Sequence, residues 1–78
     1  MTSYLDIKDV GDSISGKTKV WFVYSHVHGD KLAEIKWYGR WRQYALHPVS
    51  GTIWNDACLT EIATFLDKVN KEHRMLKA

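Results

Sequence analysis

Apolar and polar residues alternate through the middle of this chain in the pattern of β-strands. Three stretches rich in the β-branched and aromatic residues that strands prefer follow one another: TKVWFVYSHVH at 18–28, KLAEIKWY at 31–38 and WRQYALH at 41–47. Pro48 ends the last stretch, because proline cannot donate a hydrogen bond to a strand ladder. The pattern predicts an antiparallel meander.

Short segments that begin with glycine separate these stretches and predict tight hairpin turns. They are Gly29-Asp30 and Gly39-Arg40. Glycine at the first central position is typical of a two-residue type II′ turn. We therefore expect both hairpins to have two-residue turns, and the register of the sheet then follows by counting.

Two-residue turns divide the strand side chains between two faces. One face then carries three rows, which are Phe22, Trp37 and Arg42, then Tyr24, Ile35 and Tyr44, then His26, Ala33 and Leu46. The other face carries a row of Trp21, Tyr38 and Trp41. Because a one-residue slip moves every side chain of a strand to the other face, these rows depend entirely on the turn lengths.

The C-terminal part of the chain has the period of an amphipathic helix. Apolar residues recur at helical spacing, namely Leu59, Ile62, Leu66 and Val69, with Cys58 and Phe65 beside them. Asn55 or Asp56 is a suitable N-cap. The pattern predicts one helix over roughly residues 56–74.

One helix can cover only one face of a small sheet. We expect it to cover the face that is more uniformly apolar at its centre, with Tyr24, Ile35, Tyr44 and Leu46. The residues predicted to be buried together are Ile35, Tyr44, Ile62, Phe65, Leu66 and Val69. The opposite face, with the row of Trp21, Tyr38 and Trp41, would then be open.

These elements predict an α+β fold, an antiparallel three- to four-stranded β-meander with one C-terminal amphipathic helix packed on one face. Residues 51–54, GTIW, are a candidate for a short fourth strand. Residues 1–16 have irregularly spaced apolar positions, so they form either an N-terminal arm or an edge strand. Residues 17–78 are then a single ββ(β)βα domain.

Composition narrows the class of protein. A chain of 78 residues corresponds to one domain. Its one cysteine, Cys58, cannot form an intrachain disulfide, and a lone thiol fits a reducing compartment. No segment approaches the ~20 apolar residues of a membrane span. We expect a cytoplasmic protein without a membrane partner.

Charge is unevenly distributed along the chain. The net charge is +2, but residues 17–47 hold six cationic side chains against two acidic ones. The cations are Lys17, Lys19, Lys31, Lys36, Arg40 and Arg42, and the acids are Asp30 and Glu34. This basic block is either a solubilising sheet surface or the site of an anionic partner.

The sequence holds no pattern that indicates catalysis. SHVHGD at 25–30 contains two histidines, but Gly29-Asp30 is explained as a turn, and a structural zinc site normally takes four nitrogen or sulfur ligands. Cys58 has no histidine at a fixed spacing to activate it and is explained as a small core residue. There are no paired carboxylates across a cleft and no glycine-rich phosphate loop. We expect a non-enzymatic protein without metal or cofactor.

The row of Trp21, Tyr38 and Trp41 is the candidate binding site. Lys19, Lys36, Arg40 and Arg42 lie around it. Bases stack on aromatic rings while phosphates pair with Lys and Arg, which suits single-stranded nucleic acid. Trp, Tyr and Arg also dominate protein-binding hot spots, and the same row suits an isologous homodimer seam. A buried core of another packing is the remaining alternative.

The motif W-R-Q-Y at 41–44, followed by Pro48, G-T-I-W at 51–54 and C-L-x-E-I-A-x-F-L at 58–66, resembles a group of small uncharacterised proteins encoded by bacteriophages and prophages. The resemblance covers residues 32–74. It implies the cytoplasm of an infected or lysogenic bacterial host. It also implies a protein that binds nucleic acid, or one that inhibits a host protein such as a defence nuclease.

Overall fold

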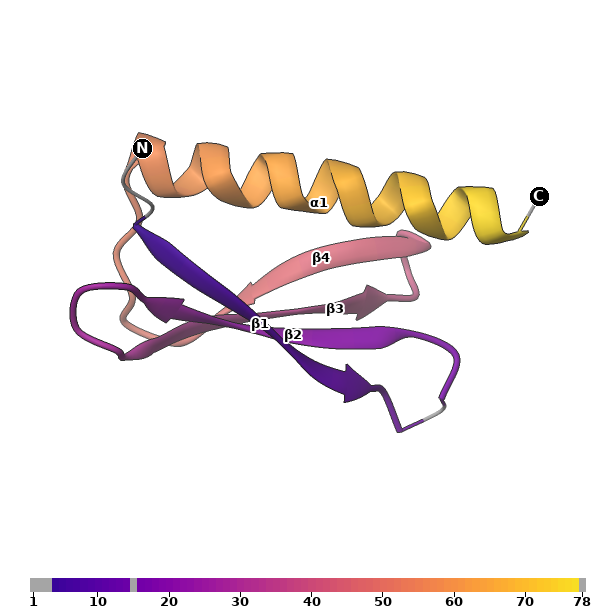
Figure 1. Cartoon of the computed structure of the whole chain (residues 1–78), viewed down its shortest axis with the longest axis horizontal. Helices are drawn as coiled ribbons and strands as arrows, with labels where there is room; N and C mark the ends of the chain where they lie inside the picture. The colour runs from indigo at the N-terminus through magenta and orange to yellow at the C-terminus, as the bar shows by residue number, and fades with distance from the viewer. Residues whose placement is uncertain (1–3, 15, 78) are drawn as a thin grey trace.

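The computed structural model is a four-stranded antiparallel sheet with one helix on one of its faces (Figure 1). It describes residues 4–14 and 16–77. The elements are β1 (Leu5–Asp12), β2 (Lys19–Ser25), β3 (Lys31–Tyr38), β4 (Gln43–Pro48) and α1 (Asp56–Lys77), and the strand order is β1-β2-β3-β4. The predicted α+β meander with a C-terminal helix is confirmed.

The fourth strand lies at the N-terminus and not after Pro48. Within the segment 1–16, residues 5–12 form the edge strand β1, while residues 1–3 and 15 lie outside the described part. The expected strand at 51–54 is wrong. There the Thr52 hydroxyl donates to the Val49 carbonyl at 2.8 Å, and the Trp54 indole N–H donates to the Thr52 hydroxyl at 2.9 Å. These local bonds fold the segment back on itself before the helix.

The hairpin between β2 and β3 is longer than predicted. Five residues, 26–30, connect the strands, and the Gly29 N–H donates to the Ser25 carbonyl at 2.8 Å. Gly29 adopts a left-handed φ of 76° near the end of this loop. Phe22 consequently lies opposite Glu34 and not opposite Trp37, a shift of three residues.

Because the shift is an odd number of residues, the side chains of β2 lie on the opposite faces from those predicted. Because successive side chains of a strand point to opposite faces, Trp21 and Val23 face the helix, whereas Phe22 and Tyr24 face away from it. Val23 is completely buried. The expectation that the helix covers Tyr24 is wrong for this reason.

The hairpin between β3 and β4 also differs, but by an even number of residues. Trp37 pairs with Tyr44 and not with Arg42, so the turn holds four residues, 39–42. Within it the Trp41 N–H donates to the Tyr38 carbonyl at 3.1 Å. Since the shift of two residues preserves the faces, Ile35, Tyr44 and Leu46 lie on the covered side as predicted.

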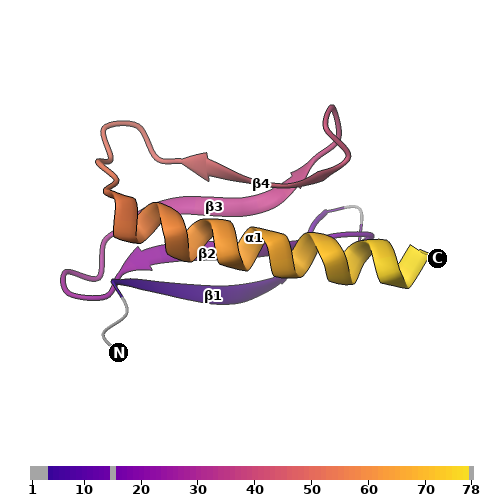
Figure 2. The same ribbon diagram turned by 90° about the horizontal axis from the view of Figure 1, so that it is seen from above.

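The helix begins where the sequence indicates. The Asn55 carboxamide oxygen accepts a hydrogen bond from the Cys58 N–H at 2.9 Å, which is the geometry of an N-cap. α1 continues to Lys77, slightly beyond the predicted end near residue 74. Figure 2 shows the helix in front of the sheet, and β1 and β4 are the two edge strands of the sheet.

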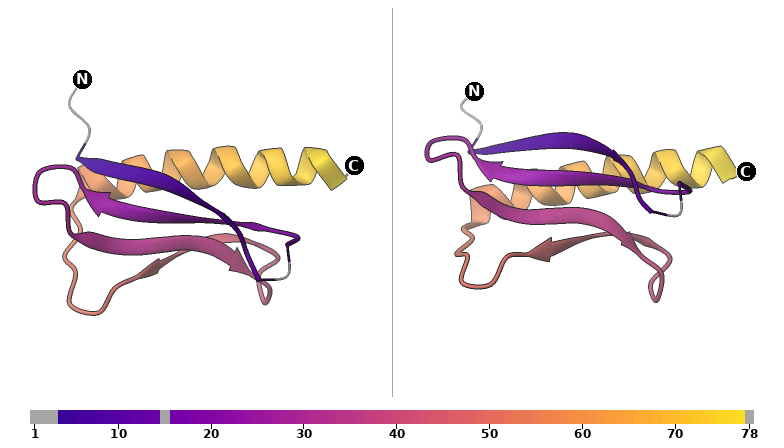
Figure 3. Two further views of the ribbon diagram at one scale, coloured as in Figure 1. Left: turned by 60° about the horizontal axis from the view of Figure 1, so that its bottom comes forward. Right: turned by 90° about the horizontal axis from the view of Figure 1, so that it is seen from below.

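The core lies between α1 and the sheet. Its buried members are Leu5, Val23, Ala33, Ile35, Tyr44, Ile62 and Val69. Phe65 and Leu66, which were predicted to be buried, are half-buried and pack against this cluster. Figure 3 shows the opposite face of the sheet, with no described element in front of it.

Candidate functional site

The sheet face turned away from α1, here called the open face, carries both aromatic and charged side chains. Strand alternation and the observed register assign to it Asp6, Lys8, Phe22, Tyr24, Glu34, Lys36, Tyr38 and His47. Ring contacts link several of these residues along and across the strands. Any surface partner of the sheet would meet this set of side chains.

The predicted row of Trp21, Tyr38 and Trp41 does not exist. The Trp21 ring lies under the helix, with its centroid 5.2 Å from the Tyr44 ring and 5.2 Å from the Phe65 ring. Both contacts are edge-to-face, the arrangement that aromatic pairs prefer. The five-residue loop before β3 causes this difference, because it turns β2 over. Trp21 therefore contributes to packing on the covered side.

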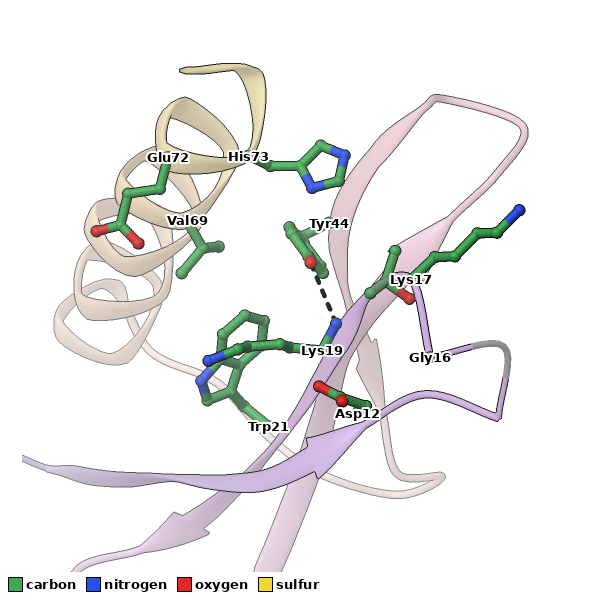
Figure 4. A pocket seen from close by; sticks show the side chains of 10 residues that line it. Asp12, Gly16, Lys17, Lys19, Trp21, Tyr44, Val69, Glu72 and His73 are labelled. Carbon is green, nitrogen blue, oxygen red and sulfur yellow. Dashed lines mark hydrogen bonds between the residues drawn. The ribbon is translucent and has the colours of Figure 1, made fainter. Parts of the chain in front are cut away.

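Lys19 is also separated from the open face. Its ammonium lies 3.5 Å from a carboxylate oxygen of Asp9, and its backbone N–H donates to the Tyr44 hydroxyl at 3.2 Å. With Trp21, Tyr44 and His73 it lines a cleft of about 280 Å³ between the sheet and the C-terminal half of α1 (Figure 4). Two of the seven predicted site residues thus belong to the other side of the molecule.

The other five predicted residues gather at the β3–β4 hairpin. The Tyr38 and Trp41 rings meet edge to face with centroids 4.8 Å apart. Trp41 is 63% exposed, and the adjacent Arg40 and Arg42 are exposed as well. Lys36 lies on the same face of β3, two residues before Tyr38. We call Lys36, Tyr38, Arg40, Trp41 and Arg42 the hairpin cluster.

Arg42 completes the turn in a left-handed conformation. Its φ is 53°, and its N–H donates to the Gly39 carbonyl at 3.2 Å. An arginine rarely adopts this region of φ. Neither Arg40 nor Arg42 forms an ion pair with any residue in the described ranges. The tip of the hairpin therefore presents two uncompensated positive charges beside an exposed indole.

A second aromatic pair on the open face was missed by the sequence analysis. The Phe22 and Tyr24 rings lie 6.5 Å apart. The Lys31 ammonium sits 3.6 Å from the Phe22 ring centroid, and that of Lys8 sits 5.5 Å from the Tyr24 centroid. These are cation–π contacts. The alternation of β2 would have revealed the pair only if the loop before β3 were known to have an odd number of residues.

Glu34 balances the charge at the centre of the open face. One of its carboxylate oxygens accepts a hydrogen bond from Lys31 at 2.8 Å, and the other lies 3.6 Å from the Lys36 ammonium. The hydrogen bond from Lys31, with a further contribution from Lys36, lowers the pKa of the Glu34 carboxyl below its ordinary value. Lys31, Glu34 and Lys36 together thus carry a net charge of +1, and Arg40 and Arg42 add two further positive charges at the hairpin.

The described residues were also compared with the requirements of a metal site and of a membrane span. No three His, Cys, Asp or Glu side chains in the described part of the chain lie close enough to hold a metal ion. No helix within residues 4–14 and 16–77 is long and apolar enough to cross a membrane.

Comparison with known proteins gives one relationship. The chain is 30% identical over 43 residues to an uncharacterised 9.3 kDa protein of Acholeplasma phage L2, and the alignment covers 55% of each chain. The chain thus spans about half the length of the curated relative it matches. No family model matches the chain, and no solved structure matches it. The similarity is to a small phage protein and carries no activity with it.

Proposed function

We propose that the hairpin cluster binds single-stranded nucleic acid. The observation that supports this most is the exposed Trp41 ring between two arginines that have no ion-pair partner among the described residues. A base can stack on the indole, and stacking contributes ~1–3 kcal/mol per base whatever the base is. A guanidinium matches the geometry of a phosphate and forms paired hydrogen bonds with it.

The neighbouring residues favour a short binding site centred on Trp41. Tyr38 contacts the indole edge to face and limits its orientations, which reduces the entropy lost on stacking. Further along the face, Lys31 already occupies the Phe22 ring at 3.6 Å. A base that stacks on Phe22 must displace that ammonium. Nucleic acid therefore meets the Trp41–Tyr38 pair first, with Lys36 beside it.

Fluorescence anisotropy of a labelled single-stranded oligonucleotide tests the proposal. Binding should weaken with salt, with a slope that corresponds to roughly two to four phosphate contacts. Trp41→Ala should weaken binding about 5- to 150-fold with little change in slope, since stacking does not release counterions. Arg40→Gln should reduce the slope by about one contact.

The matched control is Lys71→Gln, because Lys71 pairs with Asp67 at 3.0 Å on the helix, on the other side of the molecule from the open face. It removes one positive charge without touching the hairpin and should leave the slope nearly unchanged. The absence of any anisotropy change at low salt would refute nucleic-acid binding.

A host protein is the second candidate partner, and the weakly charged aromatic centre of the open face favours it. Glu34 pairs with both Lys31 and Lys36, which leaves a net charge of +1 on these three side chains beside the Phe22 and Tyr24 rings. Such surfaces with a polar rim are typical of protein interfaces. In this case the chain acts in the cytoplasm of an infected host as an inhibitor, for example of a defence nuclease. Capture of a host protein that survives both nuclease treatment and high salt, and that Trp41→Ala abolishes, would favour this function.

A further inference from the structure

The two edges of the sheet are not equivalent. On β4 the edge position Tyr44 is covered, because the Asn70 side chain from α1 bonds to both its N–H and its C=O. At the other edge the Glu61 carboxylate of α1 accepts the Tyr4 N–H at 3.0 Å, one residue before β1, but no described helix residue bonds to the Ile7 backbone. An exposed edge strand is a ready template for pairing with another chain.

The hydrogen-bond phase of β1 identifies which backbone groups face outward. The His26 N–H donates to the Tyr4 carbonyl at 3.1 Å, so Tyr4 bonds toward β2. Successive residues of an antiparallel strand alternate between the two sides. Asp6 and Lys8 therefore bond toward β2 as Tyr4 does, and the N–H and C=O of Ile7 point away from the sheet.

We propose that a second copy of this chain pairs with β1 in antiparallel fashion, with a two-fold axis at Ile7. Ile7 then lies opposite Ile7 of the second copy, and each donates its N–H to the carbonyl of the other. This register places Lys8 opposite Asp6 of the second copy, and Asp6 opposite Lys8, both on the open face. Opposite charges directly across a strand pair are stabilising, and like charges are destabilising. β1 is thus complementary in charge to itself.

Both side chains are available for such pairs. Lys8 is exposed, and its ammonium's contact among the described residues is a cation–π contact with Tyr24 at 5.5 Å. The Asp6 carboxylate is about half exposed and meets His26 at 3.1 Å, which leaves room for a second cation. Beyond these residues the strand is irregular between Asp9 and Gly11, where the Asp9 carboxylate accepts the Gly11 N–H at 2.9 Å. This bulge confines the seam to the first half of β1.

The dimer joins the two sheets into one. Because the two-fold axis of an antiparallel pair is perpendicular to the sheet, both helices lie on one side and both open faces lie on the other. The two β4 strands form the outer edges of the joined sheet, about 34 Å apart at a strand spacing of ~4.8 Å. The dimer does not depend on the ligand of the hairpin cluster, so its test is separate from that of the proposed function.

Sedimentation velocity over a range of concentrations, together with a pair of charge reversals, tests the dimer. Lys8→Asp gives β1 two carboxylates, and Asp6→Lys gives it two ammonium groups. Each variant alone should dimerise at least about tenfold more weakly than the wild type, because two attractive pairs become repulsive. An equimolar mixture of the two variants should recover the dimer, because every pair across the seam is again of opposite charge.

The controls separate dimerisation from folding. Lys71→Asp makes the same charge change on the helix, and it should dimerise as strongly as the wild type. In the wild type, the Ile7 amide should exchange slowly with solvent at high concentration and faster on dilution. A wild-type chain that stays monomeric with a rapidly exchanging Ile7 amide overturns the proposal. A dimer that both single variants retain also overturns it, since another surface must then hold the two copies together.

Discussion

The side-chain amide of Asn70 in α1 takes the place of a neighbouring strand for Tyr44 in β4. The Tyr44 N–H donates to the Asn70 oxygen at 2.7 Å, and the Asn70 amide nitrogen donates to the Tyr44 carbonyl at 3.2 Å. One residue therefore satisfies both outward backbone groups of Tyr44, near the start of this edge strand. The contact fixes the distance of α1 from β4 and protects that edge.

Replacement of Asn70 by alanine should destabilise the fold. The Tyr44 backbone groups would lose two hydrogen bonds in a partly buried position, which costs about 1–3 kcal/mol. Urea denaturation followed by circular dichroism measures the change. Asn70→Asp retains the acceptor for the Tyr44 N–H but not the donor. If the pairing is as described, Asn70→Asp should lose less unfolding free energy than Asn70→Ala. Equal stability of Asn70→Ala and the wild type would contradict it.

Replacement of Phe65 by alanine should loosen the packing over Trp21. Phe65 is half-buried and meets the Trp21 ring edge to face at 5.2 Å. Removal of a large aromatic side chain from a core costs about 3–5 kcal/mol, and partial exposure places this one at the lower end. The Trp21 emission should shift to longer wavelength as water reaches the ring.

Leu59→Ala is the matched control for the Phe65 prediction. Leu59 lies on the same helix and is 51% exposed, so its removal should change stability by only about 0.5 kcal/mol or less. If Phe65→Ala melts like Leu59→Ala, Trp21 does not pack under the helix.

The sequence predicted the elements better than their register. The helix and its Asn55 cap, and the faces of β3 and β4, follow from spacing and capping chemistry alone. Turn length does not follow from a glycine, because Gly29 fits both the first position of a two-residue turn and the left-handed position at the end of a longer loop. That ambiguity placed Trp21 in the candidate site when it belongs to the covered side.

Neither the edge strand β1 nor the contact between Tyr38 and Trp41 could be predicted from the local sequence pattern. The apolar alternation of Leu5 and Ile7 stops at the bulge near Gly11, so β1 is too short and irregular for its period to be recognised. Tyr38 and Trp41 come together because a four-residue turn brings the indole back over β3. The sequence analysis also grouped these two residues, but in a different geometry.

Acidification should remove stability that Glu34 provides. Its folded pKa is lowered chiefly by the hydrogen bond from Lys31, so the ionised carboxylate is favoured in the folded state. A group of this kind stabilises the fold above its unfolded pKa, about 4.3 for Glu, and the stabilisation is lost as pH falls through the folded value. Glu34→Gln should therefore lose less stability than the wild type between about pH 5 and pH 3. If the free energy of unfolding falls equally with pH in the variant and the wild type, protonation of Glu34 is not coupled to folding.

Substitutions at Arg42 separate its conformation from its charge. Its φ of 53° lies in a region that glycine adopts freely and β-branched residues adopt poorly. Arg42→Gly should stabilise the fold by up to about 1 kcal/mol, and Arg42→Val should destabilise it by about 1–2 kcal/mol. Both variants lose the same positive charge. If that charge contacts a phosphate, both should reduce the salt slope of oligonucleotide binding by about one, although their stabilities move in opposite directions. A slope that follows stability instead would mean that Arg42 serves only to shape the turn that presents Trp41.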